Sequence, residues 1–161
     1  MKVDIGMKGQ DREAVGQILN AVLADQHILY VKTRNYHWNV VGPQFKSLHE
    51  LFEEQYTQLA DSIDTVAERA RALGVHANGT MAEFVRDARL KEEEGRGLDS
   101  ATMVGNLVHD HESVVKQLRA DIERCDDQLG DAGTADILTG ILEDHDKMAW
   151  MLRSFLNEKS V

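Results

Sequence analysis

The chain has little of what membrane-spanning, disulfide-linked or β-rich proteins need. Its 161 residues include one proline, one cysteine and 6% aromatic residues. Cys125 cannot form an intrachain disulfide, so we expect a reducing, cytoplasmic environment. No run approaches the roughly 20 apolar residues that cross a bilayer, and no apolar segment follows the first residues, so we expect neither a membrane span nor a signal peptide. The scarcity of turn residues and β-branched runs excludes an all-β sandwich.

Positive charge is scarce as well. The chain carries 18 Lys+Arg against 28 Asp+Glu, which gives a formal net charge of −10 at pH 7. A surface of this sign repels polyanions such as nucleic acids and attracts cations. With 42% hydrophobic and 29% charged residues, the chain is expected to fold as one domain with a single core.

Apolar residues recur at helical spacing along most of the chain. A capping box formed by Thr80 and Glu83 predicts a short helix over 80–90. Gly74 is expected to end the second long helix, and Thr134 to cap the fourth. The spacing predicts four long helices, over about 11–38, 45–73, 100–125 and 134–155.

The connection between the second and third long helices, residues 75–99, is long enough to cross the length of a bundle. The sequence therefore predicts an all-α protein, a ferritin-like four-helix bundle with a short extra helix in the crossover between helices two and three. The first nine residues show no apolar periodicity. We expect a flexible N-terminal tail over 1–9 and the bundle domain over 10–158.

Five residues of metal-binding types lie in one short window: His37, His49, Glu53, Asp64 and Glu68. His49 and Glu53 are four residues apart, as are Asp64 and Glu68, so each pair projects from one helix face. At about 100° per residue, the two pairs fall within about 20° of each other around the second helix and about 110° from its apolar stripe. These four side chains therefore share a face that points away from the chain's own core.

A single metal ion cannot bridge the two pairs within one chain, because Glu53 and Asp64 are about 16 Å apart along the helix axis. A second copy of the helix, packed antiparallel, would solve this problem. A two-fold axis near residues 58 and 59 would place His49 and Glu53 against Asp64 and Glu68 of the partner subunit. Such an interface creates two equivalent sites.

His37, near the end of the first helix, could complete each site. Imidazole and carboxylate ligands without a thiolate suit iron or manganese, and also zinc. None of the seven histidines has a Glu three residues before it, so the Glu-x-x-His motif of di-iron sites inside one bundle is absent from the sequence. The alternative is that the carboxylates are ordinary solvated charges. Two histidines and three acids in this arrangement favour metal binding.

The run NYHWNVVGPQFKSLHELFEEQY, followed by DSIDTVAERARALG, resembles the Dps family, or mini-ferritins. The later run DAGTADILTGILEDHDKMAWMLRSFL and the short crossover helix fit the same family, and the resemblance covers about residues 11–157. It implies a homododecameric hollow shell with two-fold and three-fold interfaces. It also implies a ferroxidase that oxidises Fe(II), preferentially with hydrogen peroxide, stores the ferric mineral and protects against oxidative damage.

The resemblance assigns roles to individual residues. His37 and His49 match the two histidine ligands of the family's intersubunit centre, and Asp64 and Glu68 match the carboxylate pair from the other subunit. Glu53 stands where many members have Asp. The resemblance gives three further assignments: Trp38 as the tryptophan beside the centre, an electron donor to stray oxidants; Asp127, Asp131 and Asp136 as candidates for the iron-entry pores; and Glu50 and Glu54 as candidates for mineral nucleation.

Several alternatives stay open from sequence. Asp131 and Asp136 could instead cap or favour a helix N-terminus, and Glu50 and Glu54 could be solvated charge. Zinc or manganese could substitute for iron. The protein could chiefly compact DNA, with iron oxidation secondary and association with the nucleoid. Another alternative is a structural four-helix dimer. The evidence for DNA binding is weak and consists of the terminal lysines Lys2, Lys8 and Lys159. The other histidines are assigned to surface or packing positions; they are His27, His76, His109, His111 and His145.

Overall fold

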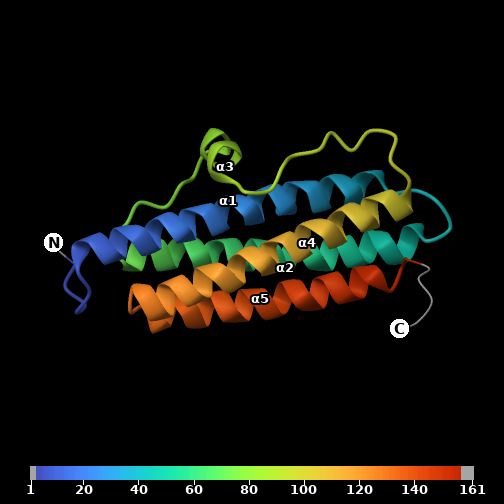
Figure 1. Ribbon diagram of the computed structural model, residues 1–161. Coiled ribbons are helices and arrows are strands. Elements are labelled where there is room, and N and C mark those ends of the chain that lie inside the picture. The colour runs from blue at the N-terminus through green and yellow to red at the C-terminus, as the bar shows by residue number, and fades with distance from the viewer. Residues whose placement is uncertain (1–2, 157–161) are drawn as a thin grey trace.

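The computed structural model describes residues 3–156, and these contain helices and no strand. Figure 1 shows four long helices lying side by side, with a short helix outside them. The elements are α1 (Gly9–Asn39), α2 (Phe45–Ala72), α3 (Met81–Asp87), α4 (Ser100–Glu123), the π-helical turn η1 (Arg124–Gln128) and α5 (Ala132–Arg153).

The long helices pack as two pairs, α1 with α2 and α4 with α5. The connection from α2 to α4 runs along the outer side of α1 and carries α3, which packs against α1 (Figure 1). This arrangement confirms the predicted four-helix bundle with an extra helix in the crossover. No helix within residues 3–156 combines the length and apolar character needed to cross a membrane.

The predicted helix signals at two loops are confirmed. Gly74 has φ +80°, and the N–H groups of Gly74 and Val75 donate to carbonyls of the last turn of α2. This left-handed position is one that glycine adopts without strain. Thr80 and Glu83 form the complete capping box at the start of α3.

Three details differ from the prediction. The short helix ends at Asp87 rather than near residue 90. The third long helix continues into η1, where a loop was expected. Asp131, not Thr134, caps α5: its carboxylate accepts the backbone N–H of Thr134. Both residues are good caps three positions apart, and Arg69 selects Asp131 by pairing with its carboxylate across 2.7 Å.

The N-terminal end of the described chain lies against the bundle. Met7 is partly buried and packs on the hydrophobic core before α1 begins at Gly9. The predicted limits of the domain, at residues 10 and 158, stay a prediction; residues 1–2 and 157–158 lie outside the described residues.

The core is divided into two hydrophobic clusters along the bundle. One cluster contains Leu19, Val66 and Leu118, and the other contains Leu29, Phe52 and Leu107. In each long helix, one segment packs in the first cluster and another segment packs in the second, and a polar residue lies between these two segments. These four residues, here called the polar layer, are Gln26 of α1, Ser62 of α2, His111 of α4 and His145 of α5.

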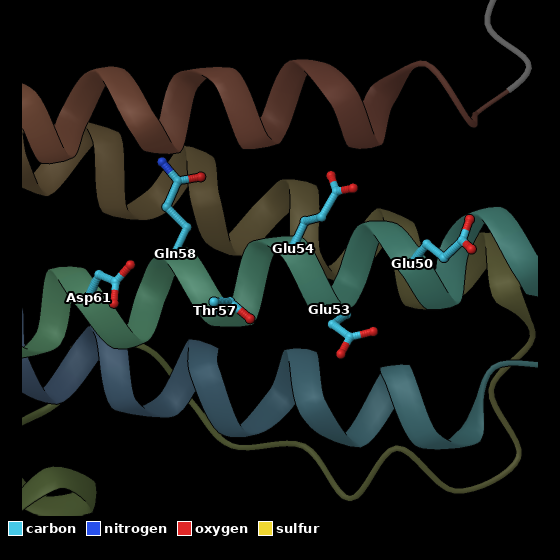
Figure 2. Close-up of a pocket in the computed structure, with 6 residues that line it drawn as sticks. All are labelled: Glu50, Glu53, Glu54, Thr57, Gln58 and Asp61. Carbon is cyan, nitrogen blue, oxygen red and sulfur yellow. The ribbon is translucent and has the colours of Figure 1, made fainter.

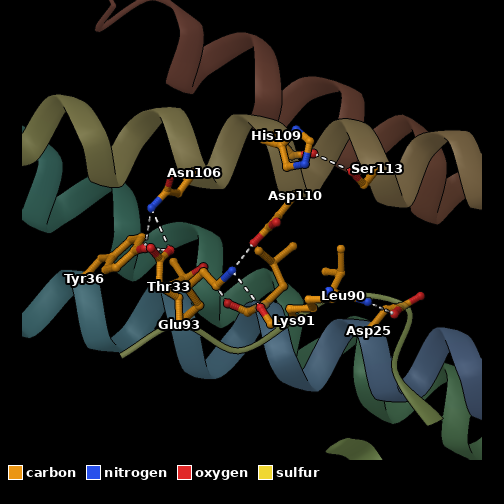
Figure 3. A network of polar contacts seen from close by, with 12 residues as sticks. Asp25, Thr33, Tyr36, Leu90, Lys91, Glu93, Asn106, His109, Asp110 and Ser113 are labelled. Atoms are coloured by element: carbon orange, nitrogen blue, oxygen red, sulfur yellow. Dashed lines mark hydrogen bonds and ion pairs between the residues drawn. The ribbon is translucent and has the colours of Figure 1, made fainter. Parts of the chain in front are cut away.

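The crossover is held to the bundle by ion pairs and hydrogen bonds (Figure 3). Buried Lys32 of α1 pairs with Asp110 of α4 and also donates to the backbone carbonyl of Lys91 in the crossover. Arg89 pairs with Asp25 of α1 and Asp121 of α4, each across 2.7 Å. These contacts fix α1 against α4 and hold the crossover to both helices.

Candidate metal centre

His37 and His49 form a close pair across the turn from α1 to α2. Their rings stack with centroids 3.8 Å apart and planes 18° from parallel. Nδ1 of His37 lies 2.8 Å from the carbonyl oxygen of His49, and Nδ1 of His49 lies 2.8 Å from the carbonyl oxygen of His37. The two histidines are thus locked together by a reciprocal pair of ring-to-backbone hydrogen bonds.

This geometry decides which ring nitrogen is available to a ligand. A carbonyl oxygen only accepts hydrogen bonds, so each Nδ1 carries the hydrogen. In the neutral imidazole, Nε2 then keeps its lone pair, which is the form that binds a metal ion. A hydrogen bond from the second ring nitrogen also fixes the orientation of a metal-binding histidine. Both Nε2 atoms therefore keep a lone pair that could bind a metal ion.

Glu53 lies one helical turn after His49 and is exposed. The hydroxyl oxygen of Tyr56 is 3.4 Å from Oε1 of Glu53, and its ring packs edge-on against the ring of His37, with centroids 5.3 Å apart. Desolvation and the charge of Glu53 raise the pKa of Tyr56, so its phenol is protonated at neutral pH. Phe45 stacks on the other side of His49 at 5.1 Å.

Asp64 and Glu68 are also exposed, farther along α2. Within residues 3–156, no group of three or more His, Cys, Asp or Glu side chains is close enough to hold a metal ion. One chain therefore brings His37 and His49 together, with Glu53 near them, but does not bring in Asp64 and Glu68. Completion of the site by a partner subunit stays a prediction.

The exposed face of α2 carries a row of polar side chains around Glu50 and Glu54, the predicted nucleation residues. Figure 2 shows Glu53 pointing toward α1, whereas Glu54 and Gln58 point to the other side of the helix. Glu50 pairs with Lys46 across 2.7 Å. The carboxylates of this row therefore divide between two faces of α2. The row borders a shallow hollow on the surface of α2, which is lined by Glu50, Glu53, Glu54, Thr57, Gln58 and Asp61.

Trp38 is 64% exposed at the end of α1, next to an arginine that sequence reasoning missed. The guanidinium carbon of Arg34 lies 4.9 Å from the centre of the Trp38 ring, 5.4 Å from that of Tyr30 and 5.5 Å from that of Tyr56. Arg34 also donates from Nη1 to the Tyr30 hydroxyl at 2.9 Å. The i, i+4 spacing of Tyr30, Arg34 and Trp38 was a usable signal for this cluster.

The three pore candidates differ in their surroundings. Asp127 and Asp136 are exposed. Asp131 is 5% exposed, and its carboxylate accepts hydrogen bonds from Arg69 and from the backbone and hydroxyl of Thr134. Its oxygens are therefore engaged in holding the start of α5 to α2 within the subunit.

Two of the histidines assigned to surface or packing form a buried pair. Nδ1 of His111 is 2.9 Å from Nδ1 of His145, so one ring donates and the other accepts. Burial lowers the pKa of His145 to about 4, and burial and His145 together lower that of His111 well below 6.5. His27 packs on Phe84 with ring centroids 3.6 Å apart, while His76 and His109 are exposed.

Comparisons with known proteins identify relatives of the whole chain. The ferritin-like domain model matches residues 16–160. The chain is 47% identical over 160 residues to an uncharacterized low temperature-induced protein of Nostoc, covering 99% of this chain and 89% of that protein. It is 40% identical over 150 residues to the DNA protection during starvation protein of Brevibacillus brevis, covering 93% and 99%. The crystal structure of the DPS protein from Vibrio cholerae, described as a member of a superfamily of ferritin-like diiron-carboxylate proteins, matches with TM-score 0.87 and 28% identity over 97% of this chain and 100% of that chain.

Proposed function

The chain belongs to the Dps family of ferritin-like proteins, and we propose that it is a ferroxidase that oxidises Fe(II), preferably with hydrogen peroxide, between two-fold-related subunits. The observation that carries this proposal is the reciprocal hydrogen bonding of His37 and His49, which leaves two imidazole Nε2 atoms free beside Glu53. Asp64 and Glu68 of the partner subunit complete the ligand set. Carboxylates bind both Fe(II) and Fe(III), as a redox site requires.

Electron counting explains why iron ions should react in pairs. One Fe(II) gives one electron to hydrogen peroxide and releases a hydroxide ion and a hydroxyl radical. Two Fe(II) ions supply both electrons, so the peroxide is reduced to two hydroxide ions and no radical is released. A site that pairs the two oxidations therefore protects the cell as well as storing iron.

The same proposal includes the assembly. Twelve subunits form a hollow cytoplasmic shell with two-fold and three-fold interfaces, and the ferric product accumulates inside it. The exposed carboxylates of Glu50 and Glu54 nucleate the mineral, and the exposed Asp127 and Asp136 attract cations at the three-fold pores. Asp131 chiefly anchors α5 through Arg69. Zinc and manganese compete with Fe(II) for the same ligands.

The test is anaerobic loading with Fe(II), followed by hydrogen peroxide, while ferric absorbance in the near ultraviolet is recorded. The variant is Asp64→Ala/Glu68→Ala. The control is Glu92→Ala/Glu94→Ala, which removes two exposed carboxylates of the crossover. We expect rapid oxidation at about two Fe(II) per peroxide in the native protein and the control, and its loss in the variant. Equal rates in all three proteins, or a native rate no faster than buffer, would overturn the proposal.

The alternative that the protein chiefly binds DNA has a separate test. Of the terminal lysines, Lys8 is exposed, while Lys2 and Lys159 lie outside the described residues. Binding through phosphate contacts weakens steeply with salt. A mobility shift that appears at low salt and disappears with added salt, together with absent ferroxidase activity, would favour the DNA-binding alternative. A dimer without a larger assembly would favour the structural alternative.

A further inference from the structure

We propose that Tyr56 is the first side chain oxidised when a hydroxyl radical forms at the iron site, and that Arg34 directs this oxidation away from Trp38. The inference rests on the proposed ferroxidase function, because Fe(II) and hydrogen peroxide supply the radical. It revises the role that the resemblance to the Dps family implied for Trp38.

Tyr56 is in direct contact with two of the candidate ligands. Its hydroxyl oxygen lies 3.4 Å from a carboxylate oxygen of Glu53, and its ring meets the edge of His37. A radical released between these ligands therefore meets the phenol of Tyr56 within van der Waals distance. The two candidate ligands lie on different helices, so Tyr56 of α2 contacts candidate iron-binding side chains from both α1 and α2 of its own subunit.

Arg34 makes Trp38 a poorer electron donor. A guanidinium group above an aromatic ring is attracted to its electron-rich face. Removing an electron from that ring gives an indole cation facing a second positive charge, and this repulsion opposes the oxidation. The centre of the Trp38 ring is 4.9 Å from the Arg34 guanidinium carbon, which is the shortest of its three ring contacts.

Tyr56 meets a smaller penalty because its phenol gives up a whole hydrogen atom in one step, whereas an indole that loses its electron first forms the cation before its N–H proton leaves. The hydroxyl radical takes the phenolic hydrogen, so the O–H bond of Tyr56 breaks, an O–H bond of water forms, and a neutral phenoxyl radical remains. No new charge then faces Arg34, which lies 5.5 Å from the Tyr56 ring. Tyr30 packs edge-on against Tyr56, with centroids 6.0 Å apart, and accepts a hydrogen bond from Arg34. Arg34 is therefore a positioning residue that holds the tyrosines beside the site.

The chain suits a direct test because it has three tyrosines, Tyr30, Tyr36 and Tyr56. The assembled protein is loaded anaerobically with Fe(II) below the level that fills paired sites, mixed with hydrogen peroxide and frozen rapidly. Paramagnetic resonance then identifies the radical, and ferric absorbance is recorded on the same samples. The variants are Tyr56→Phe, Trp38→Phe and Arg34→Gln. Tyr36→Phe is the matched control, because Tyr36 is buried and its hydroxyl group bonds to Glu93 of the crossover and Asn106 of α4.

We expect a tyrosyl signal in the native protein that persists in Tyr36→Phe and Trp38→Phe and is mostly lost in Tyr56→Phe. In Arg34→Gln, we expect the signal to shift toward tryptophan. A mainly tryptophanyl signal in the native protein, or a tyrosyl signal that Tyr56→Phe leaves intact, would overturn the inference while leaving the ferroxidase proposal in place. A native rate of Fe(II) oxidation no faster than buffer would overturn both.

Discussion

The side chains of His111 and His145 meet in the middle of the bundle, with their Nδ1 atoms 2.9 Å apart. They belong to the polar layer between the two hydrophobic clusters, and Nε2 of His111 has no hydrogen-bond partner among the described residues. A neutral pair can share one proton in this hydrogen bond. Protonation of both rings would place two positive charges side by side in the core.

Acid should therefore destabilise the fold through this pair. The folded-state pKa of both residues lies below the ordinary value of 6.5, and that of His145 is about 4. Between pH 6.5 and pH 4, the two histidines bind protons in the unfolded chain but not in the folded chain. Their contribution to the free energy of unfolding is therefore complete above pH 6.5 and is lost as the pH falls toward 4. The expected loss is about 1.4 kcal/mol per pH unit for each histidine. Denaturant unfolding at several pH values, followed by circular dichroism, measures this slope.

The matching variant is His111→Gln/His145→Gln, in which neither side chain titrates. Its free energy of unfolding should change much less between pH 6.5 and pH 4 than that of the native protein. Parallel pH profiles for the two proteins would show that other groups cause the acid sensitivity.

Glu53 and Glu54 offer a matched pair of substitutions on α2. Figure 2 shows Glu53 on the side of α2 that faces α1, whereas Glu54 lies on the other side of the helix. Glu53→Gln removes a charged oxygen ligand from the iron site, so we expect Fe(II) affinity to fall about tenfold or more. Glu54→Gln removes the same charge one residue later and should leave this affinity within a factor of about two. Anaerobic titration calorimetry with Fe(II) distinguishes them; equal losses would mean that only the overall charge of the face matters.

Asp131 should matter more for stability than the other pore candidates. Asp131→Ala removes the cap of α5 and leaves the partly buried Arg69 without its carboxylate, so the free energy of unfolding should fall by about 3 kcal/mol. Asp131→Asn keeps a capping oxygen and should cost less. The exposed Asp127 and Asp136 serve as controls, for which Ala variants should stay within about 0.5 kcal/mol. Chemical denaturation measures all four; an Asp131→Ala value as small as the controls would contradict the anchoring role.

Much of the fold could be predicted from local signals. Apolar periodicity, Gly74 and the Thr80–Glu83 capping box each depend on residues close in sequence, and all reappear in the structure. The cap of α5 could not be predicted, because Asp131 and Thr134 are equivalent locally and the choice depends on Arg69, which is 62 residues away from Asp131. The turn η1 has no comparable sequence signal.

The candidate site was only partly predictable for the same reason. The helical spacing indicated that Glu53, Asp64 and Glu68 share an outward face, and all three are exposed. The stacking of His37 on His49 and their reciprocal hydrogen bonds depend on how the turn after α1 brings two helices together. No spacing rule within one helix contains that information.

The central claim is that each iron site is shared between two subunits, and mixed assemblies test it most directly. One variant, His37→Ala/His49→Ala, lacks the histidines, and the other, Asp64→Ala/Glu68→Ala, lacks the distal carboxylates. Each alone should be inactive in peroxide-driven Fe(II) oxidation. When the two are co-assembled in equal amounts, half of the two-fold pairs contain both chains, and each such pair has one intact site, so about a quarter of the native activity should return. Activity that stays at the level of the separate variants, with mixed assembly shown by mass spectrometry, would contradict a shared site.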